Sequence, residues 1–134
     1  MSEKPLGYKA LLETANAEVK AVSPAEAALL QGRDDHCFVD IRDPRELERE
    51  GRIDGAHLAP RGMLEFWIDP ESPYHKPLFA QDVTFVFFCA GGWRSALAAK
   101  LAQDMGLKSV VHIEGGMSAW KKAGLAVEVG TPKP

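Results

Sequence analysis

The feature that most constrains the fold is a nearly continuous apolar run at residues 83–88, which leads directly into Cys89 and a loop with two glycines. A strand with one solvent-exposed face alternates apolar and polar residues. This run shows no such alternation, as is typical of a strand buried on both faces of a parallel sheet. A helix is expected directly after the loop, over residues 95–105, with Gly106 as its end. The run therefore predicts a strand, loop and helix at the centre of an α/β fold.

The rest of the chain repeats this alternation. Further strands are expected at residues 37–41 and 109–113, and residues 52–60 read as short and irregular. Helices are expected at residues 6–19, 24–31, 44–50 and 63–68 and after Gly115-Gly116. This order predicts a parallel β-sheet flanked by helices on both faces. We expect a helical arm packed on the domain (residues 1–20), the domain itself (21–130) and a short tail (131–134).

Length and charge exclude several function classes. A chain of 134 residues suits one domain. Its net charge of −3 argues against nucleic acid as a partner, and no apolar run approaches the roughly 20 residues of a membrane span. The first residues lack the pattern of a secretory signal, so we expect a cytoplasmic protein. Cys37 and Cys89 are too few for a disulfide framework, and no His, Cys, Asp or Glu spacing indicates a metal.

The segment Cys89–Ser95, here called the cysteine loop, is the expected site of chemistry. Cys89 follows a buried strand, at the sheet edge where open α/β folds bind ligands. Glycine permits the backbone angles that let several N–H groups point at one centre, and Ser95 is expected to cap the next helix, whose N-terminus favours negative charge. Such surroundings activate a thiol, so we expect a nucleophile rather than an inert buried cysteine. The expected anion cradle consists of Ala90, Gly91, Gly92, Trp93, Arg94 and Ser95.

Four motifs occur in order along the chain. They are Val39-Asp40-Ile41-Arg42 before an acidic helix, the segment Gly51–His57, the cysteine loop, and Gly115-Gly116-Met117-Ser118-Ala119-Trp120. Together they resemble the rhodanese (thiosulfate sulfurtransferase) homology domain of the single-domain type. The resemblance spans residues 22–127 and implies a parallel sheet with helices on both faces.

The resemblance also implies an activity. In that family the Cys89 thiolate would take the outer sulfur of a donor such as thiosulfate, and the resulting persulfide would pass this sulfur to a thiophilic acceptor (cyanide or a thiol), with no metal or organic cofactor. Four residues separate Cys89 from Arg94, as in rhodanese-type loops. The related dual-specificity phosphatases have five, which favours sulfur transfer over phosphatase or arsenate reductase activity.

Several residues are expected to support this site. Arg94 either faces the bound anion or pairs with Asp40 or an acidic residue of the segment 43–50, and we favour the pairing. Asp40 and Arg42 are expected to support the loop, with Arg42 paired to Glu46 at helical spacing.

The segment 61–82 is longer than in minimal family members. It is expected to wall the mouth of the site with Arg61, Trp67 and His75, although an extra packed lobe fits the same residues equally well.

A second hypothesis stays open at this point. Well-studied family members that use thiosulfate often have basic residues directly after the cysteine, whereas this chain has Ala90-Gly91. An uncharged loop would suit a sulfur-carrier or interaction module that receives its sulfur from a partner protein in a relay. Turnover of free thiosulfate would favour the enzyme, and a persulfide that forms only with a partner would favour the carrier.

Overall fold

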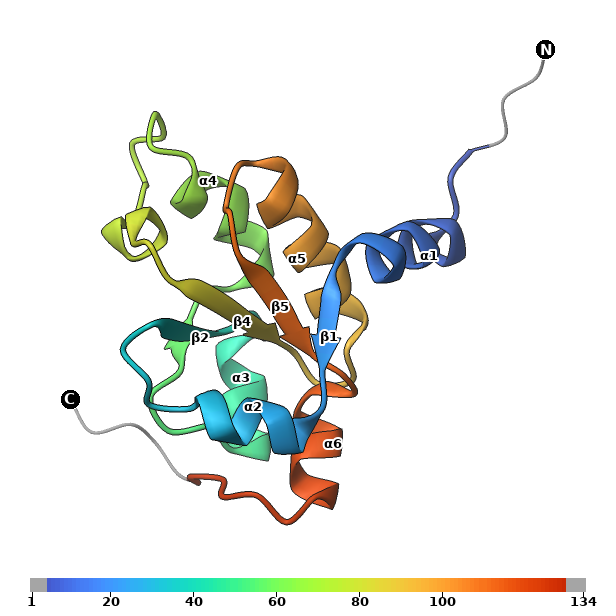
Figure 1. Cartoon of the computed structure of the whole chain (residues 1–134), viewed down its shortest axis with the longest axis vertical. Coiled ribbons are helices and arrows are strands. Elements are labelled where there is room, and N and C mark those ends of the chain that lie inside the picture. The colour runs from blue at the N-terminus through green and yellow to red at the C-terminus, as the bar shows by residue number, and fades with distance from the viewer. Residues whose placement is uncertain (1–4, 130–134) are drawn as a thin grey trace.

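A five-stranded parallel sheet forms the centre of the part of the chain that the computed structural model describes, residues 5–129 (Figure 1). In spatial order its strands are β1 (Lys20–Val22), β5 (Val110–Ile113), β4 (Thr84–Phe88), β2 (His36–Asp40) and β3 (His57–Leu58). The central strand β4 pairs with β2 and β5. Its residues from Phe85 to Phe88 are at most 1% exposed, which explains why the run carries no polar alternation.

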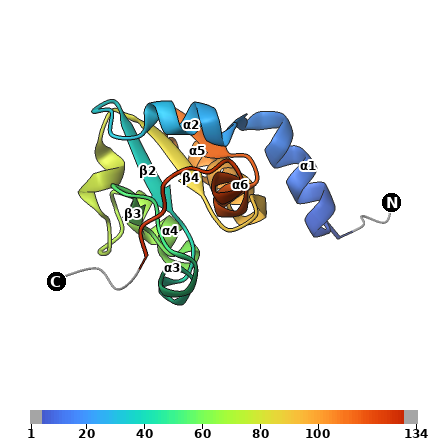
Figure 2. The same cartoon turned by 90° about the horizontal axis from the view of Figure 1, so that it is seen from below.

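Helices cover both faces of the sheet, as expected from the sequence (Figures 1 and 2). They are α1 (Tyr8–Glu18), α2 (Pro24–Leu30), α3 (Pro44–Glu50), α4 (Leu64–Ile68), α5 (Trp93–Asp104) and α6 (Gly116–Lys122), with 3₁₀ turns η1 (Arg61–Met63) and η2 (Pro77–Ala80). One core cluster joins α4 and α5 to the sheet face that carries Phe85 and Phe87. The other joins α2 and α6 to the face that carries Phe38 and Phe88.

Two short strands and one helix start differ from the sequence predictions. The edge strands β1 and β3 have three and two residues, too few to produce a recognisable periodicity, and β3 lies within the segment expected to be irregular. The helix after the cysteine loop begins at Trp93 rather than Ser95. Ser95 is therefore not its N-cap, because Gly92 takes that place in a left-handed conformation.

The N-terminal helix α1 lies beyond β1 at the side of the molecule (Figure 1) and packs on α5. Its residue Ala15 is completely buried in this contact region. Within residues 5–129, no helix combines the length and apolar character needed to cross a membrane. The expected tail at 131–134 lies outside the described residues.

Candidate functional site

Cys89 lies where the sheet connections diverge. From β2 the chain continues to β3 on one side, and from β4 it continues to β5 on the other. Such a switch point, beyond the carboxyl ends of two adjacent parallel strands, is where α/β sheets bind ligands. The amide of Ile41 donates to the carbonyl oxygen of Phe88 at 3.1 Å and ties the two strand ends together.

Two main-chain amides converge on the Cys89 sulfur. The N–H of Gly92 lies 3.1 Å from Sγ and the N–H of Ser95 lies 3.4 Å from it. The φ angle of Gly92 is +102°, so this geometry requires a conformation that residues with side chains rarely adopt. Among residues 5–129, these are the amides that bond the sulfur. Contacts of the amides of Ala90, Gly91, Trp93 and Arg94 with a bound anion stay a prediction.

The Ser95 side chain turns toward the sulfur. Its Oγ lies 3.6 Å from Cys89 Sγ, donates to the carbonyl oxygen of Gly92 at 3.3 Å and lies 3.2 Å from His112 Nδ1. All three side chains are at most 4% exposed. Burial lowers the pKa of His112, against a smaller opposite effect of Glu114, and so favours the neutral imidazole.

Helix α6 holds the other side of the cysteine loop. The amide of Met117 donates to the carbonyl oxygen of Cys89 at 2.8 Å, and the amide of Ser118 donates to that of Ala90 at 3.0 Å. A Cβ atom at Gly116 would overlap the Cys89 carbonyl oxygen and come within 2.9 Å of that of Ala90. A glycine is therefore needed at position 116, because the backbone of the loop lies directly against the start of α6.

Arg94 points to helix α3 and forms a bidentate ion pair with Glu46. Its Nη1 and Nη2 lie 2.9 and 2.8 Å from the two carboxylate oxygens. These hydrogen bonds lower the pKa of Glu46 to about 2 and raise that of Arg94. The capping box of Asp43 and Glu46 starts α3 and fixes Glu46 in this position. The guanidinium therefore links the cysteine loop to the segment after β2.

The expected pairing of Arg42 with Glu46 is wrong, because Arg42 bonds Asp40. Its Nη2 lies 2.6 Å from Asp40 Oδ2, and it also donates to the carbonyl oxygen of Gly51 at 2.9 Å. Both charged side chains are buried, with 0% and 1% of the residue exposed. The helical spacing of Arg42 and Glu46 does not apply because Arg42 precedes the helix, and its buried side chain pairs with Asp40 at the end of β2.

The segment 61–82 packs largely on the domain. Arg61 pairs with Glu65 at 3.1 Å and lines a groove between α1 and α5, and Trp67 lies 4.9 Å from the Lys76 ammonium. His75 has a buried Nδ1 with no hydrogen-bond partner among the described residues. Trp67 packs against the core cluster that contains Cys89. The place of these three side chains at the mouth of the site stays a prediction.

Trp93, the first residue of α5, has surroundings that could not be predicted from the sequence. Its side chain is 63% exposed, and its ring lies 5.3 Å from that of Tyr8. Helix α1 thus reaches the rim of the cysteine loop.

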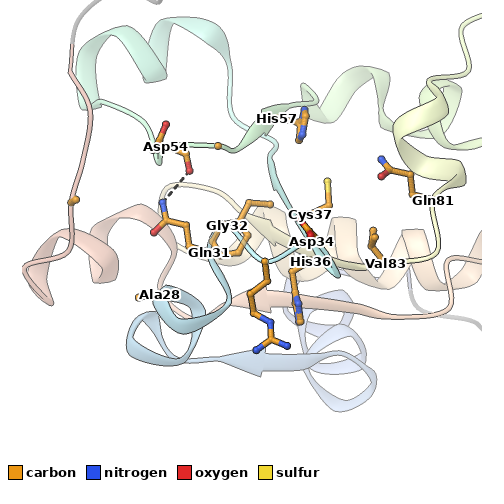
Figure 3. Close-up of a pocket in the computed structure, with 14 residues that line it drawn as sticks. Ala28, Gln31, Gly32, Asp34, His36, Cys37, Asp54, His57, Gln81 and Val83 are labelled. Carbon is orange, nitrogen blue, oxygen red and sulfur yellow. Dashed lines mark hydrogen bonds between the residues drawn. The ribbon is translucent and has the colours of Figure 1, made fainter.

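The second cysteine, Cys37, lies in the inner strand β2 near the amino ends of the strands, whereas Cys89 follows their carboxyl ends. Cys37 pairs in register with Phe85, four residues before Cys89, which is about 13 Å along the strand and too far for a disulfide. Burial raises the pKa of its thiol to about 11. A cavity of about 640 Å³ opens beside it, with His57 and Gln81 but not Cys89 in its lining (Figure 3).

The chain matches the model of a known family over most of its length. A model of the rhodanese-like domain matches residues 23–123. The chain belongs to the rhodanese-like domain family. Solved rhodanese-like structures share its fold, including a thiosulfate sulfurtransferase from Pseudomonas aeruginosa that superposes with a TM-score of 0.69.

Named relatives in this family include sulfurtransferases. The thiosulfate sulfurtransferase GlpE of Vibrio cholerae is 30% identical over 104 residues, 78% of this chain and 89% of that protein. A structure from Rhodopseudomonas palustris, described as a protein of unknown function and possible tyrosine phosphatase, is 56% identical, with a TM-score of 0.90 over 96% of this chain and 99% of the other. The chain spans 53% of the length of one curated relative, an uncharacterized protein of Synechocystis, and 20% of another, the probable adenylyltransferase/sulfurtransferase MoeZ of Mycobacterium tuberculosis.

Proposed function

We propose that this rhodanese-like protein transfers a sulfane sulfur through a persulfide on Cys89. The observation that carries the proposal is the convergence of the Gly92 and Ser95 amides on Cys89 Sγ, at 3.1 and 3.4 Å. Main-chain donors fixed around a sulfur favour its anionic form and need no rearrangement during the reaction. Relatives named as sulfurtransferases support this function at the level of the family.

The reaction takes place in two displacements. The Cys89 thiolate attacks the outer sulfur of thiosulfate, a Cys89 S–S bond forms, and the donor's S–S bond breaks with its electron pair leaving on sulfite. A thiolate or cyanide acceptor then attacks the outer sulfur of the persulfide. The Cys89 thiolate leaves, and the product is a persulfide or thiocyanate. The amides of Gly92 and Ser95 stabilise the sulfur anion before and after each step.

Phosphate hydrolysis fits this loop less well. A phosphatase needs its loop arginine on the phosphate oxygens, whereas both terminal nitrogens of Arg94 bond Glu46. The loop has four residues between Cys89 and Arg94, as expected for sulfur transfer. A phosphate-ester assay tests this alternative directly.

A carrier role is the second candidate, and one observation favours it. The positions after Cys89 are Ala90 and Gly91, and Arg94 is committed to Glu46, so the loop offers a dianion such as thiosulfate little positive charge. Under this alternative, a partner protein delivers the sulfur directly to Cys89 in a relay.

Mass spectrometry after exposure to thiosulfate separates these candidates. We expect Cys89 to gain one sulfur atom and to lose it again on addition of cyanide, with thiocyanate released. Cys89→Ser should gain none and keep the fold, and Cys37→Ser serves as the matched control that still gains sulfur. Persulfide that forms only with a donor protein would favour the carrier. Sulfur uptake by Cys89→Ser at the wild-type level would contradict both.

A further inference from the structure

A buried histidine lies behind the reactive sulfur and is not used in the reaction described above. His112 belongs to β5, pairs in register with Phe87 of β4, and is 4% exposed. Its Nδ1 lies 3.2 Å from Ser95 Oγ, and Ser95 Oγ lies 3.6 Å from Cys89 Sγ. The Ser95 hydroxyl group therefore lies between the imidazole and the sulfur and links them.

The other ring nitrogen decides which tautomer this site holds. His112 Nε2 is buried and has no hydrogen-bond partner among the described residues. A proton on Nε2 would leave an orphaned buried N–H, which is rarer in proteins than an acceptor left empty. The neutral ring therefore carries its proton on Nδ1 and donates it to Ser95 Oγ.

This tautomer determines which acceptors the Ser95 hydroxyl can donate its hydrogen bond to. With Nδ1–H as donor to Oγ, the hydroxyl hydrogen is free to bond either the carbonyl oxygen of Gly92, at 3.3 Å, or Cys89 Sγ. While Cys89 is a thiol, its S–H donates to Oγ and the hydroxyl donates to Gly92. With the opposite tautomer, the hydroxyl would donate to His112 and would be lost to the sulfur.

We propose that His112 is a positioning residue for Cys89: by donating to Ser95 Oγ, it leaves the hydroxyl hydrogen free to turn to the sulfur once that sulfur is ionised or carries a persulfide. The proposal rests on the proposed function, because sulfur transfer passes through both the thiolate and the persulfide of Cys89. A donor that also accepts a hydrogen bond is polarised by it, so the hydroxyl becomes a stronger donor.

The other charged groups near the hydrogen bonds that link His112, Ser95 and Cys89 have ionic partners or positions of their own. Arg94 lies within electrostatic reach of Cys89 but pairs with Glu46, and Asp40 pairs with Arg42. Glu114, two residues after His112, is the carboxylate that acts on the imidazole. The variants below leave all five groups in place, so a change in Cys89 ionisation reports on His112 and Ser95.

The test measures Cys89 ionisation and persulfide formation in variants of the full chain. Thiolate absorbance in the ultraviolet is titrated with pH, with Cys89→Ser as the baseline, and the rate of persulfide formation with thiosulfate is followed by mass spectrometry. His112→Leu removes the donor at similar volume, and His112→Asn keeps an N–H close to the position of Nδ1. His57→Leu, at the opposite edge of the sheet, is the matched control.

We expect His112→Leu to raise the titration midpoint and to slow persulfide formation at pH 7 by roughly three- to tenfold, the effect of one hydrogen bond. His112→Asn should restore most of the rate. Because His112 acts through Ser95, Ser95→Ala combined with His112→Leu should equal Ser95→Ala alone. A His112→Leu variant that titrates like the wild type, or effects of the two substitutions that add, would overturn the proposal.

Nitrogen NMR of the wild-type imidazole gives a second measurement that does not depend on a variant folding. We expect the proton on Nδ1, and a proton on Nε2 would refute the proposal. If the wild type takes up no sulfur from thiosulfate, the proposed function fails, while the titration and the tautomer still decide the role of His112.

Discussion

The ion pair between Arg94 and Glu46 gives the sharpest test of how the cysteine loop is held. Glu46→Gln exchanges a carboxylate oxygen for an amide group that cannot accept from the guanidinium. The Glu46 side chain is 19% exposed and that of Arg94 is 42% exposed, so the pair lies between a surface pair and a buried one. Surface pairs contribute up to about 1 kcal/mol, and breaking a buried pair costs about 3–5 kcal/mol. With solvent screening included, we expect Glu46→Gln to lower the free energy of unfolding at pH 7 by about 1–2 kcal/mol.

The pH dependence of this loss has a definite direction. The pKa of Glu46 falls from 4.5 to about 2 in the folded protein because Arg94 donates to the carboxylate. A carboxyl group with a lowered folded-state pKa stabilises the protein fully above its unfolded-state pKa and loses that contribution as pH falls toward the folded-state value. The difference in stability between wild type and Glu46→Gln should therefore be constant above about pH 5 and shrink between pH 4.5 and 2.

Urea denaturation followed by circular dichroism, at pH 7 and at intervals down to pH 3, measures this difference. At pH 7 the expected loss corresponds to a decrease in Tm of about 3–10 °C for a domain of this size. Glu48→Gln makes the same chemical change on the exposed side of α3 and should stay within about 0.5 kcal/mol of wild type. A stability difference that persists unchanged at pH 3, or that is equal for the two variants, would refute the reasoning.

Two other contacts of the loop lead to further predictions. Gly116→Ala should lower the free energy of unfolding by about 2–4 kcal/mol in denaturant titrations, because φ is +56° and the new Cβ meets the carbonyl oxygens of Cys89 and Ala90; wild-type stability would show that the loop can move away. Asp40→Asn should lower it by about 3–5 kcal/mol, because Arg42 is left as an uncompensated buried charge; a loss below about 1 kcal/mol would argue against this pair as a support of the loop.

The central elements of the fold were predictable because their signals are local. The apolar run before Cys89 has no polar alternation, and the structure places it in the middle of the sheet with neighbours on both sides. The helices expected at residues 24–31 and 44–50 begin as predicted at Pro24 and Pro44, each directly after a capping residue. In each case the residues that show the sequence pattern also form the strand or helix start that the pattern predicts.

Contacts between distant segments were harder to predict. Arg42 and Glu46 have helical spacing, but the carboxylate of Asp40 faces Arg42 from the strand end. Glu46 pairs with Arg94, 48 residues later, within the acidic segment 43–50 that was expected to pair with Arg94, although the sequence could not select which of its residues does so. The contact of His112 with Ser95 joins strand β5 to the start of helix α5. It depends on the register between β4 and β5, which the sequence does not show. The short strand β1 gave no signal because β5 supplies its pairing partners from the far end of the chain.

The hold of α6 on the carbonyl oxygens of Cys89 and Ala90 has a consequence for the order in which the protein matures. During synthesis the segment that carries the nucleophile leaves the ribosome well before residues 116–118, which supply the opposing amides and the space under the loop. A nascent chain that ends before Gly116 thus contains Cys89, Gly92 and Ser95 but lacks the platform that shapes them. The carbonyl oxygens of Cys89 and Ala90 therefore gain their donors only after α6 has been made, so the loop is fixed in place later than it is synthesised.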